Sequence, residues 1–184
     1  MTKDLDLLYR TVSESDLVFV ATDTELSRYL INEACLASDT PAVYGGAYER
    51  AFAGEVLRVV PGVAGCYACV RQGLANTMRS MSGQQVFDYT DDADFQAEPG
   101  LGIDVAFLAM LQAKVALMTL LRGTDSSLGD IEAEMIIWTN RARPEDGELF
   151  ERPMARFFVD VPRNEECAVC GRDSDIVAGG ERRP

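Results

Sequence analysis

The sequence predicts an α/β domain in which helices flank a largely parallel sheet and a four-cysteine zinc site ties the end of the chain to its middle. Three observations lead to this prediction. In the first part of the chain, strand candidates alternate with amphipathic helix candidates. The strands are continuously apolar, as in a sheet that is covered on both faces. Four of the five cysteines form two Cys-x-x-Cys pairs, the spacing of a metal site.

The first elements follow one another without long gaps. We expect a short helix over Leu5–Val12, a strand over Leu17–Ala21 and an amphipathic helix over Glu25–Ala37. Pro41 marks a turn, because proline removes a backbone donor and disfavours helix at the residue before it. The apolar run Ala42–Ala47 then predicts a second buried strand.

The middle of the chain is less regular. Phe52–Val60 reads as a strand, and its short link to the previous strand favours an antiparallel pair. Val70–Met81 is weakly helical. Ser82–Gly100 is glycine-marked and acidic, and its simplest interpretation is a solvated loop, although loops of this length are often functional.

The longest helix candidate is Leu101–Arg122, which ends at Gly123. It is apolar around most of its circumference, so we expect it to be buried on several sides. Two more strands are predicted at Glu134–Thr139 and Arg156–Val161.

Composition bounds the organisation of the chain. With 184 residues and 47% hydrophobic content it can form one core, and we expect a single domain over residues 1–170 and a flexible tail over 171–184. The net charge of −13 argues against nucleic acid and favours a basic protein or peptide partner. There is no histidine, which excludes Ser-His-Asp and Cys-His catalysis, so any metal must be held by thiolate or oxygen.

Nothing in the sequence predicts export or a membrane span. The first ten residues lack the cationic start and apolar run of a signal peptide. Lys114 stands near the centre of the most apolar helix candidate, where a lysine costs roughly 2.5–3.5 kcal/mol on membrane-insertion scales. Five cysteines without an export signal indicate a reducing compartment. We therefore expect a cytoplasmic protein.

The corner between the first strand and the helix Glu25–Ala37 is the first candidate site. Asp23 follows the strand, where ligands bind in an open parallel sheet and where the next helix presents its positive N-terminus. A carboxylate in this place suits a magnesium ion whose other ligands are phosphate oxygens. The alternative is a helix cap, since Thr22, Asp23 and Thr24 are all favoured cap residues.

The paired cysteines predict a structural zinc site. Cys66/Cys69 and Cys167/Cys170 supply the four thiolates of a closed tetrahedral shell, which leaves no position for substrate. Compact zinc fingers usually separate their pairs by roughly 12–20 residues, whereas these pairs stand much farther apart, so the metal would act as a clasp. The alternative is a redox Cys-x-x-Cys, which needs only one pair and favours a helix directly after it. Cys35 is better interpreted as a small buried hydrophobe than as a nucleophile.

Together these residues resemble the ThiF/MoeB/ubiquitin-activating-enzyme superfamily. The similar segments, which span about Asp16 to Gly171, are Thr22-Asp23 with Arg28 and Asn32, Pro41–Ala47, Gly54–Val56, Pro61-Gly62, Cys66–Cys69, Leu111–Ala113 and Cys167–Gly171.

The resemblance implies a ThiF-type, Rossmann-like sheet and an ATP-dependent adenylyltransferase. Such an enzyme transfers the adenylyl group of ATP to the C-terminal carboxylate of a ubiquitin-like or sulfur-carrier protein, releases pyrophosphate, and works as a homo- or hetero-dimer. Asp23 and Thr22 would bind magnesium–ATP, Arg28 would serve in catalysis, and the zinc would be structural. From its position alone, Arg28 could equally pair with Glu25 or Glu33 on the surface.

The sequence also departs from the family pattern. No strand with a glycine-rich phosphate loop precedes Asp16, and Gly100-Leu101-Gly102 lacks the third glycine of such a loop. Thr24 replaces the usual asparagine. No cysteine lies between Val70 and Glu166, so adenylation without a thioester is the most that the resemblance implies.

Three functions remain open from the sequence. The chain could be the C-terminal half of an adenylyltransferase that needs a partner or a missing N-terminal segment for ATP. It could instead be a non-catalytic, zinc-stabilised module that docks a carrier protein or an activating partner. A zinc-stabilised structural domain without a ligand is the third.

Overall fold

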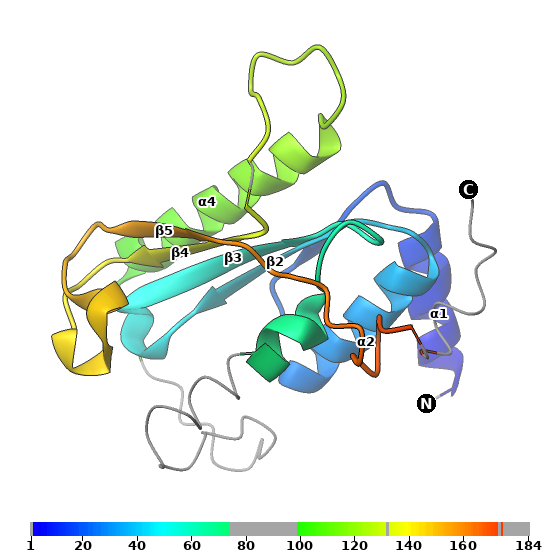
Figure 1. Cartoon of the computed structure of the whole chain (residues 1–184), viewed down its shortest axis with the longest axis horizontal. Coiled ribbons are helices and arrows are strands. Elements are labelled where there is room, and N and C mark those ends of the chain that lie inside the picture. The colour runs from blue at the N-terminus through cyan, green and yellow to red at the C-terminus, as the bar shows by residue number, and fades with distance from the viewer. Residues whose placement is uncertain (1, 74–98, 132, 173, 175–184) are drawn as a thin grey trace.

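The computed structural model describes residues 2–73, 99–131, 133–172 and 174, and shows a mixed sheet with helices on both faces (Figure 1). The five strands of the described chain lie side by side in chain order. β1 and β2 are parallel, with Val18 opposite Ala42, and every other neighbouring pair is antiparallel. The strands are β1 (Val18–Val20), β2 (Ala42–Ala47), β3 (Ala53–Val59), β4 (Met135–Thr139) and β5 (Arg156–Val159).

The β1–α2–β2 unit is close to the prediction. Helix α2 (Glu25–Ala37) and strand β2 have the predicted bounds. Helix α1 (Thr2–Ser13) is longer than the predicted Leu5–Val12. Strand β1 is shorter than Leu17–Ala21, because only three of its residues pair with β2 before the chain turns toward α2.

The rest of the sheet corrects the expectation of a largely parallel one. The prediction that β3 is antiparallel to β2 is confirmed, and their link is the single 3₁₀ turn η1 (Glu49–Ala51), in which Arg50 and Ala51 both have φ of 52°. The turns η3 (Pro144–Asp146) and η4 (Glu148–Phe150) likewise bring β5 back beside β4. Short links of this kind favour antiparallel pairs, so the parallel part is confined to β1 and β2.

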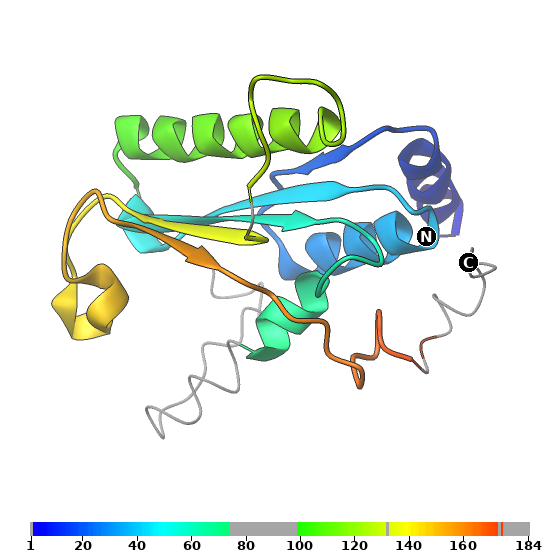
Figure 2. The same ribbon diagram turned by 45° about the horizontal axis from the view of Figure 1, so that its top comes forward.

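Two cores lie on opposite faces of the sheet (Figure 2). Helix α4 (Gly102–Leu120) covers one face, where Val43, Val56 and Leu108 pack together. On the other face, α2 and the helical residues 67–73 cover Tyr44 and Leu57. The four paired cysteines belong to this second core, so the metal site and the corner before α2 are built on the same face.

The expectation that the longest helix is buried on several sides is wrong. In the described part of the chain, α4 packs on β2 and β3 with one side, and Ile103 and Met110 on its outer side are 71% and 72% exposed. A helix with apolar residues all round can pack with one side or with several, and its sequence does not distinguish the two cases. By length and composition α4 could cross a membrane, which for a single helix is weak evidence because core helices of globular domains pass the same test.

Two predictions fall largely outside the described residues. Most of the acidic loop 82–100 and the last ten residues of the predicted tail, 175–184, belong to the parts of the chain that the structure does not describe. The predicted helix Val70–Met81 is seen only to residue 73, and it begins earlier, at residue 67.

Candidate functional site

The corner after β1 places Asp23 at the carboxyl end of the parallel strand pair. Thr24 caps α2: its Oγ1 accepts the backbone N–H of Ser27 at 3.3 Å. The cap alternative is therefore realised by Thr24 and not by Asp23. The carboxylate of Asp23 is exposed and makes no hydrogen bond or ion pair with any residue that the structure describes. It is available to a ligand beside the positive end of α2.

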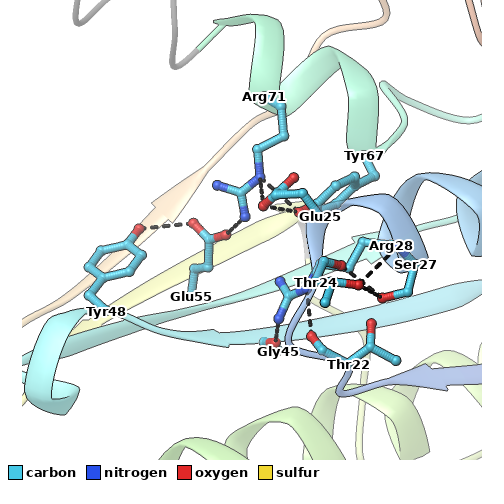
Figure 3. A network of polar contacts seen from close by, with 10 residues as sticks. All are labelled: Thr22, Thr24, Glu25, Ser27, Arg28, Gly45, Tyr48, Glu55, Tyr67 and Arg71. Atoms are coloured by element: carbon cyan, nitrogen blue, oxygen red, sulfur yellow. Dashed lines mark hydrogen bonds and ion pairs between the residues drawn. The ribbon is translucent and has the colours of Figure 1, made fainter. Parts of the chain in front are cut away.

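Arg28 holds the corner from inside the helix layer (Figure 3). Its Nε donates to the carbonyl of Thr22 at 2.9 Å, and its Nη2 donates to the carbonyl of Gly45 at 2.8 Å. Thr22 follows the carboxyl end of β1, and Gly45 lies within β2. Arg28 makes no ion pair with Glu25 or Glu33 in the described chain, so the surface-pair alternative is wrong. Its guanidinium joins the two neighbouring strands instead.

Gln112 joins the same two strands from the opposite face of the sheet. Its Nε2 donates to the carbonyls of Val20 and Val43 at 2.8 and 2.9 Å, and its side chain is buried. It occupies the space over Gly45, where a Cβ would overlap Gln112 Oε1. Sequence reasoning gave Gln112 no role, although a glutamine in so apolar a helix was a usable signal.

Thr22 carries an unusual hydroxyl. Its Oγ1 is buried and has no hydrogen-bond partner among the described residues. Buried hydroxyls are nearly always paired, so such an atom calls for an explanation, such as a ligand or an ordered water. The predicted binding residues Thr22 and Asp23 are thus adjacent, one with a buried hydroxyl and one with an open carboxylate.

A second polar cluster lies nearby on the α2 face and was missed by sequence reasoning (Figure 3). Glu55 is 4% exposed, accepts from Tyr48 at 2.9 Å and pairs with Arg71 at 2.5 Å. Burial lowers the pKa of Arg71, but Glu55 and Tyr67 outweigh this effect and raise it, so the guanidinium stays charged. The only signal was a glutamate inside the apolar strand β3.

Tyr67 connects this cluster to α2. Its hydroxyl donates to Glu25 at 2.8 Å and accepts from Arg71 Nε at 3.0 Å. Its ring stacks on Tyr44 of β2 with centroids 4.8 Å apart. Because Tyr67 lies inside the first Cys-x-x-Cys, the network joins the cysteine site to the helix that carries Arg28.

The four paired cysteines come together as predicted. All four are buried, and their Sγ atoms lie within 4.8 Å of one another. The Cys66–Cys69 and Cys66–Cys167 sulfurs are 3.9 Å apart, and those of Cys69 and Cys170 are 3.4 Å apart. Four convergent sulfurs in one buried cluster could hold a metal ion and match the donor set of a structural zinc site.

The local backbone supports this arrangement. A Cβ at Gly171 would overlap the carbonyl of Cys167, and one at Gly65 would lie 2.7 Å from the carbonyl of Pro162. Glycine is therefore required beside both pairs, where the chain passes close to itself. The N–H of Gly171 donates to the Cys167 carbonyl at 2.7 Å and closes the second turn.

The pKa values of the clustered thiols are shifted in opposite directions. A hydrogen bond from Cys170 lowers the pKa of Cys66 to about 5 despite its burial. The same bond raises the pKa of Cys170, and burial raises that of Cys69. Cys66 is thus the thiol of the three that most readily gives the thiolate, the form that binds metals.

The redox alternative has one point in its favour, since a helix does begin within the first pair, at residue 67. The clustering of the second pair on the same site favours the metal instead. Cys35 is 1% exposed, and burial raises the pKa of its thiol to about 12, as suits an inert core residue.

Two surface hollows lie elsewhere. One, of about 310 Å³, is lined around Arg141 and Arg143, and the other, of about 390 Å³, around Arg152 and Phe157. Neither includes Asp23. The corner after β1 therefore lies outside both of these hollows.

Comparison with known proteins identifies relatives of the chain. A SAMP-activating enzyme E1 from Haloferax volcanii is 26% identical over 170 residues, which cover 91% of this chain and 51% of that protein. The chain thus spans about half the length of this relative.

Solved structures share the fold. E. coli MccB with succinimide has a TM-score of 0.57 at 14% identity, and the match covers 89% of this chain and 42% of MccB. E. coli MccB with ATP has a TM-score of 0.51 at 17% identity, with the same coverage. A heterocyclase in complex with substrate and cofactor has a TM-score of 0.53 at 15% identity, over 93% of this chain and 24% of that one.

The family model that matches the chain covers residues 2–143, from α1 through the corner, the first cysteine pair and α4 to the end of β4. The chain belongs to the ThiF family.

Proposed function

We propose that this chain forms the C-terminal half of an adenylyltransferase site that activates the C-terminal carboxylate of a ubiquitin-like or sulfur-carrier protein. The observation that carries the proposal is the open carboxylate of Asp23, at the carboxyl end of a parallel strand and beside a helix N-terminus, in a ThiF-family chain. Its relative from Haloferax volcanii is named for activation of a SAMP protein, which supports a carrier of this kind.

In the proposed reaction, a carboxylate oxygen of the carrier attacks the α-phosphorus of ATP. The bond between the α-phosphorus and the bridging oxygen breaks, and pyrophosphate leaves with the electron pair, giving an acyl-adenylate. Bound magnesium would neutralise the phosphate charge during this step.

The chain's own residues would bind and position. Asp23 would hold the magnesium, and the unpartnered hydroxyl of Thr22 supports a role for that residue toward the nucleotide. Arg28, which we expected in catalysis, has two of its nitrogens engaged with strand carbonyls, so we propose that it positions the corner.

The remaining parts of the site would come from a partner or from a segment outside this sequence. Among the described strands β1 is an edge strand of parallel type, and edge strands offer their outer backbone to another strand. Phe19 on this strand is 47% exposed. We propose that an α/β partner carrying the glycine-rich loop adds its strand here.

We also propose that the metal of the four-cysteine site is zinc. Four thiolates without histidine or carboxylate fit zinc, and the second turn, Cys167–Gly171, is tied by this site to the helix at residues 67–73. It would stabilise the fold that presents the corner and take no part in the reaction.

The test is carrier-dependent ATP–pyrophosphate exchange in the complex with the complementing half. We expect Asp23→Ala to lower the exchange rate at least about 100-fold, as is typical for loss of charge stabilisation at a reacting phosphate. Asp16→Ala is the matched control, because Asp16 is also exposed but lies before the amino end of the same strand. Its exchange rate should stay within about twofold of the unchanged chain.

Two outcomes would overturn the proposal. Equal rates for Asp23→Ala and the unchanged complex would remove Asp23 from the chemistry. Carrier binding without exchange, unaffected by Asp23→Ala, would favour the non-catalytic docking module instead.

A further inference from the structure

The Asn32 side chain lies between α2 and the first cysteine turn, and one of its polar atoms is unpaired. Asn32 is 0% exposed. Its Oδ1 accepts the backbone N–H of Tyr67 at 3.1 Å. Its Nδ2 is also buried but has no hydrogen-bond partner in the described chain. A buried carboxamide with only one end satisfied is uncommon in native proteins.

The surroundings of Asn32 indicate which group could accept a hydrogen bond from its Nδ2. Tyr67 directly follows Cys66, so the bond to the Tyr67 N–H fixes the carboxamide against the turn that carries the Cys66 thiol. The carboxamide is thus held at this turn, although it forms no hydrogen bond with the thiol in the described chain.

Metal binding would make Cys66 Sγ a stronger hydrogen-bond acceptor for the Asn32 amide. A metal-bound cysteine is a thiolate, which accepts hydrogen bonds more strongly than a thiol does. Groups that donate to metal ligands fix their orientation and contribute to metal affinity. An N–H that has no partner in the protein alone is thus suited to the metal-loaded state.

We propose that Asn32 is a positioning residue of the four-cysteine metal centre, donating Nδ2–H to Cys66 Sγ when the metal is bound while its Oδ1 holds the Tyr67 N–H. The inference rests on the metal part of the proposed function and is independent of the nucleotide chemistry. It also gives the buried asparagine of the Thr22–Asn32 motif a task distinct from that of Arg28, one turn earlier on α2.

The same contact links the metal to the corner. Tyr67 is already joined to α2 by its hydroxyl, which donates to Glu25. Asn32 adds a second connection farther along the helix. Through these two connections the cysteine turn sets the position of the helix whose first residues carry the corner.

The first test compares two amide-to-carboxylate changes. Asn32→Asp keeps an oxygen for the Tyr67 N–H but removes the N–H donor and adds negative charge beside the thiolates. Asn164→Asp is the matched control: Asn164 lies near the second cysteine pair, but its amide donates to Gln72 at 2.9 Å. Zinc affinity would be measured in the full chain at pH 8 by competition with a chromophoric chelator.

We expect Asn32→Asp to raise the zinc dissociation constant about 10–100-fold and Asn164→Asp to change it by less than about threefold. Equal effects of the two changes would overturn the inference. A wild-type chain that binds no zinc would overturn both this inference and the proposed metal, without touching the test of nucleotide chemistry.

A second measurement needs no variant, in case Asn32→Asp does not fold. In the ¹⁵N-labelled wild-type chain loaded with ¹¹³Cd, a hydrogen bond to a coordinated sulfur transmits a scalar coupling between the amide proton and the metal. We expect this coupling at one side-chain proton of Asn32. Couplings confined to backbone amides would contradict the proposed bond.

Discussion

Single residues hold the corner together from both faces of the sheet. Arg28 reaches the carbonyls of Thr22 and Gly45 from the α2 side, and Gln112 reaches those of Val20 and Val43 from the α4 side. β1 and β2 are thus joined by charged and amide donors beside the carboxyl end of β1, while Asp23 next to them is left open. Rigid surroundings with one uncommitted carboxylate are what a positioned metal ligand requires.

Gly45 is the residue that lets these two layers approach, and its substitution gives a prediction. Gly45→Ala would place a Cβ on Gln112 Oε1, which must move and weaken its two bonds to the strands. We expect a loss of about 2–3 kcal/mol in the free energy of unfolding, as for other overpacked cores. Urea unfolding with an unchanged slope would measure it.

Gly102→Ala provides the control for this change. A Cβ at Gly102 meets no atom within 4 Å, so the free energy of unfolding should change by less than about 0.5 kcal/mol. Equal destabilisation by both substitutions would show that the contact with Gln112 does not matter.

The sequence predicts such residues unevenly. The clustering of the four cysteines could be predicted from their spacing. Asp23 was a candidate because of its place after a strand, and Arg28 because of the family resemblance. The pairing of Glu55 with Arg71 could not, because no periodicity or motif relates positions on a strand and on a helix beyond it. The unpaired Nδ2 of Asn32 likewise becomes visible only when its surroundings are known.

At the scale of helices and strands, the residues near an element's ends determine where it begins and ends. The elements packed around it determine how far it is buried. α2 and β2 were predicted correctly because a threonine cap begins the helix and Pro41 precedes the strand. The exposure of α4 was not predictable, since its composition suits a helix with neighbours all round but the described chain supplies only the sheet.

The cysteine clasp joins two elements that are far apart in sequence, and its protonation gives a pH prediction. The pKa values of Cys69 and Cys170 are raised, so both thiols hold protons near neutral pH that the metal must displace. The pKa of Cys66 is lowered instead, by its hydrogen bond from Cys170, so its proton is lost more readily. Metal affinity should therefore fall as the pH falls, by about tenfold per pH unit for each displaced proton.

Competition titrations with zinc between pH 8 and pH 6 would measure this slope, and proton release on binding can be followed in weakly buffered solution. We expect at least the two protons of Cys69 and Cys170 to be released per ion. An affinity independent of pH in this range would contradict the assignment of those protons.

At the scale of the molecule, the described part of the sheet ends at β1, whose strand partner there is β2. The chain spans about half of its Haloferax volcanii relative. The missing glycine-rich loop led to the prediction of an incomplete ThiF-type domain. The exchange assay with the complementing half tests whether a partner supplies that loop.

The most direct measurement of the central claim is the position of the nucleotide metal in that complex. With Mn²⁺–ATP bound, paramagnetic broadening of NMR signals in the labelled chain falls steeply with distance from the ion. The account predicts the strongest broadening at Thr22, Asp23 and Thr24, and its loss in Asp23→Ala but not in Asp16→Ala. Broadening centred elsewhere, or none at the corner while exchange proceeds, would contradict the account.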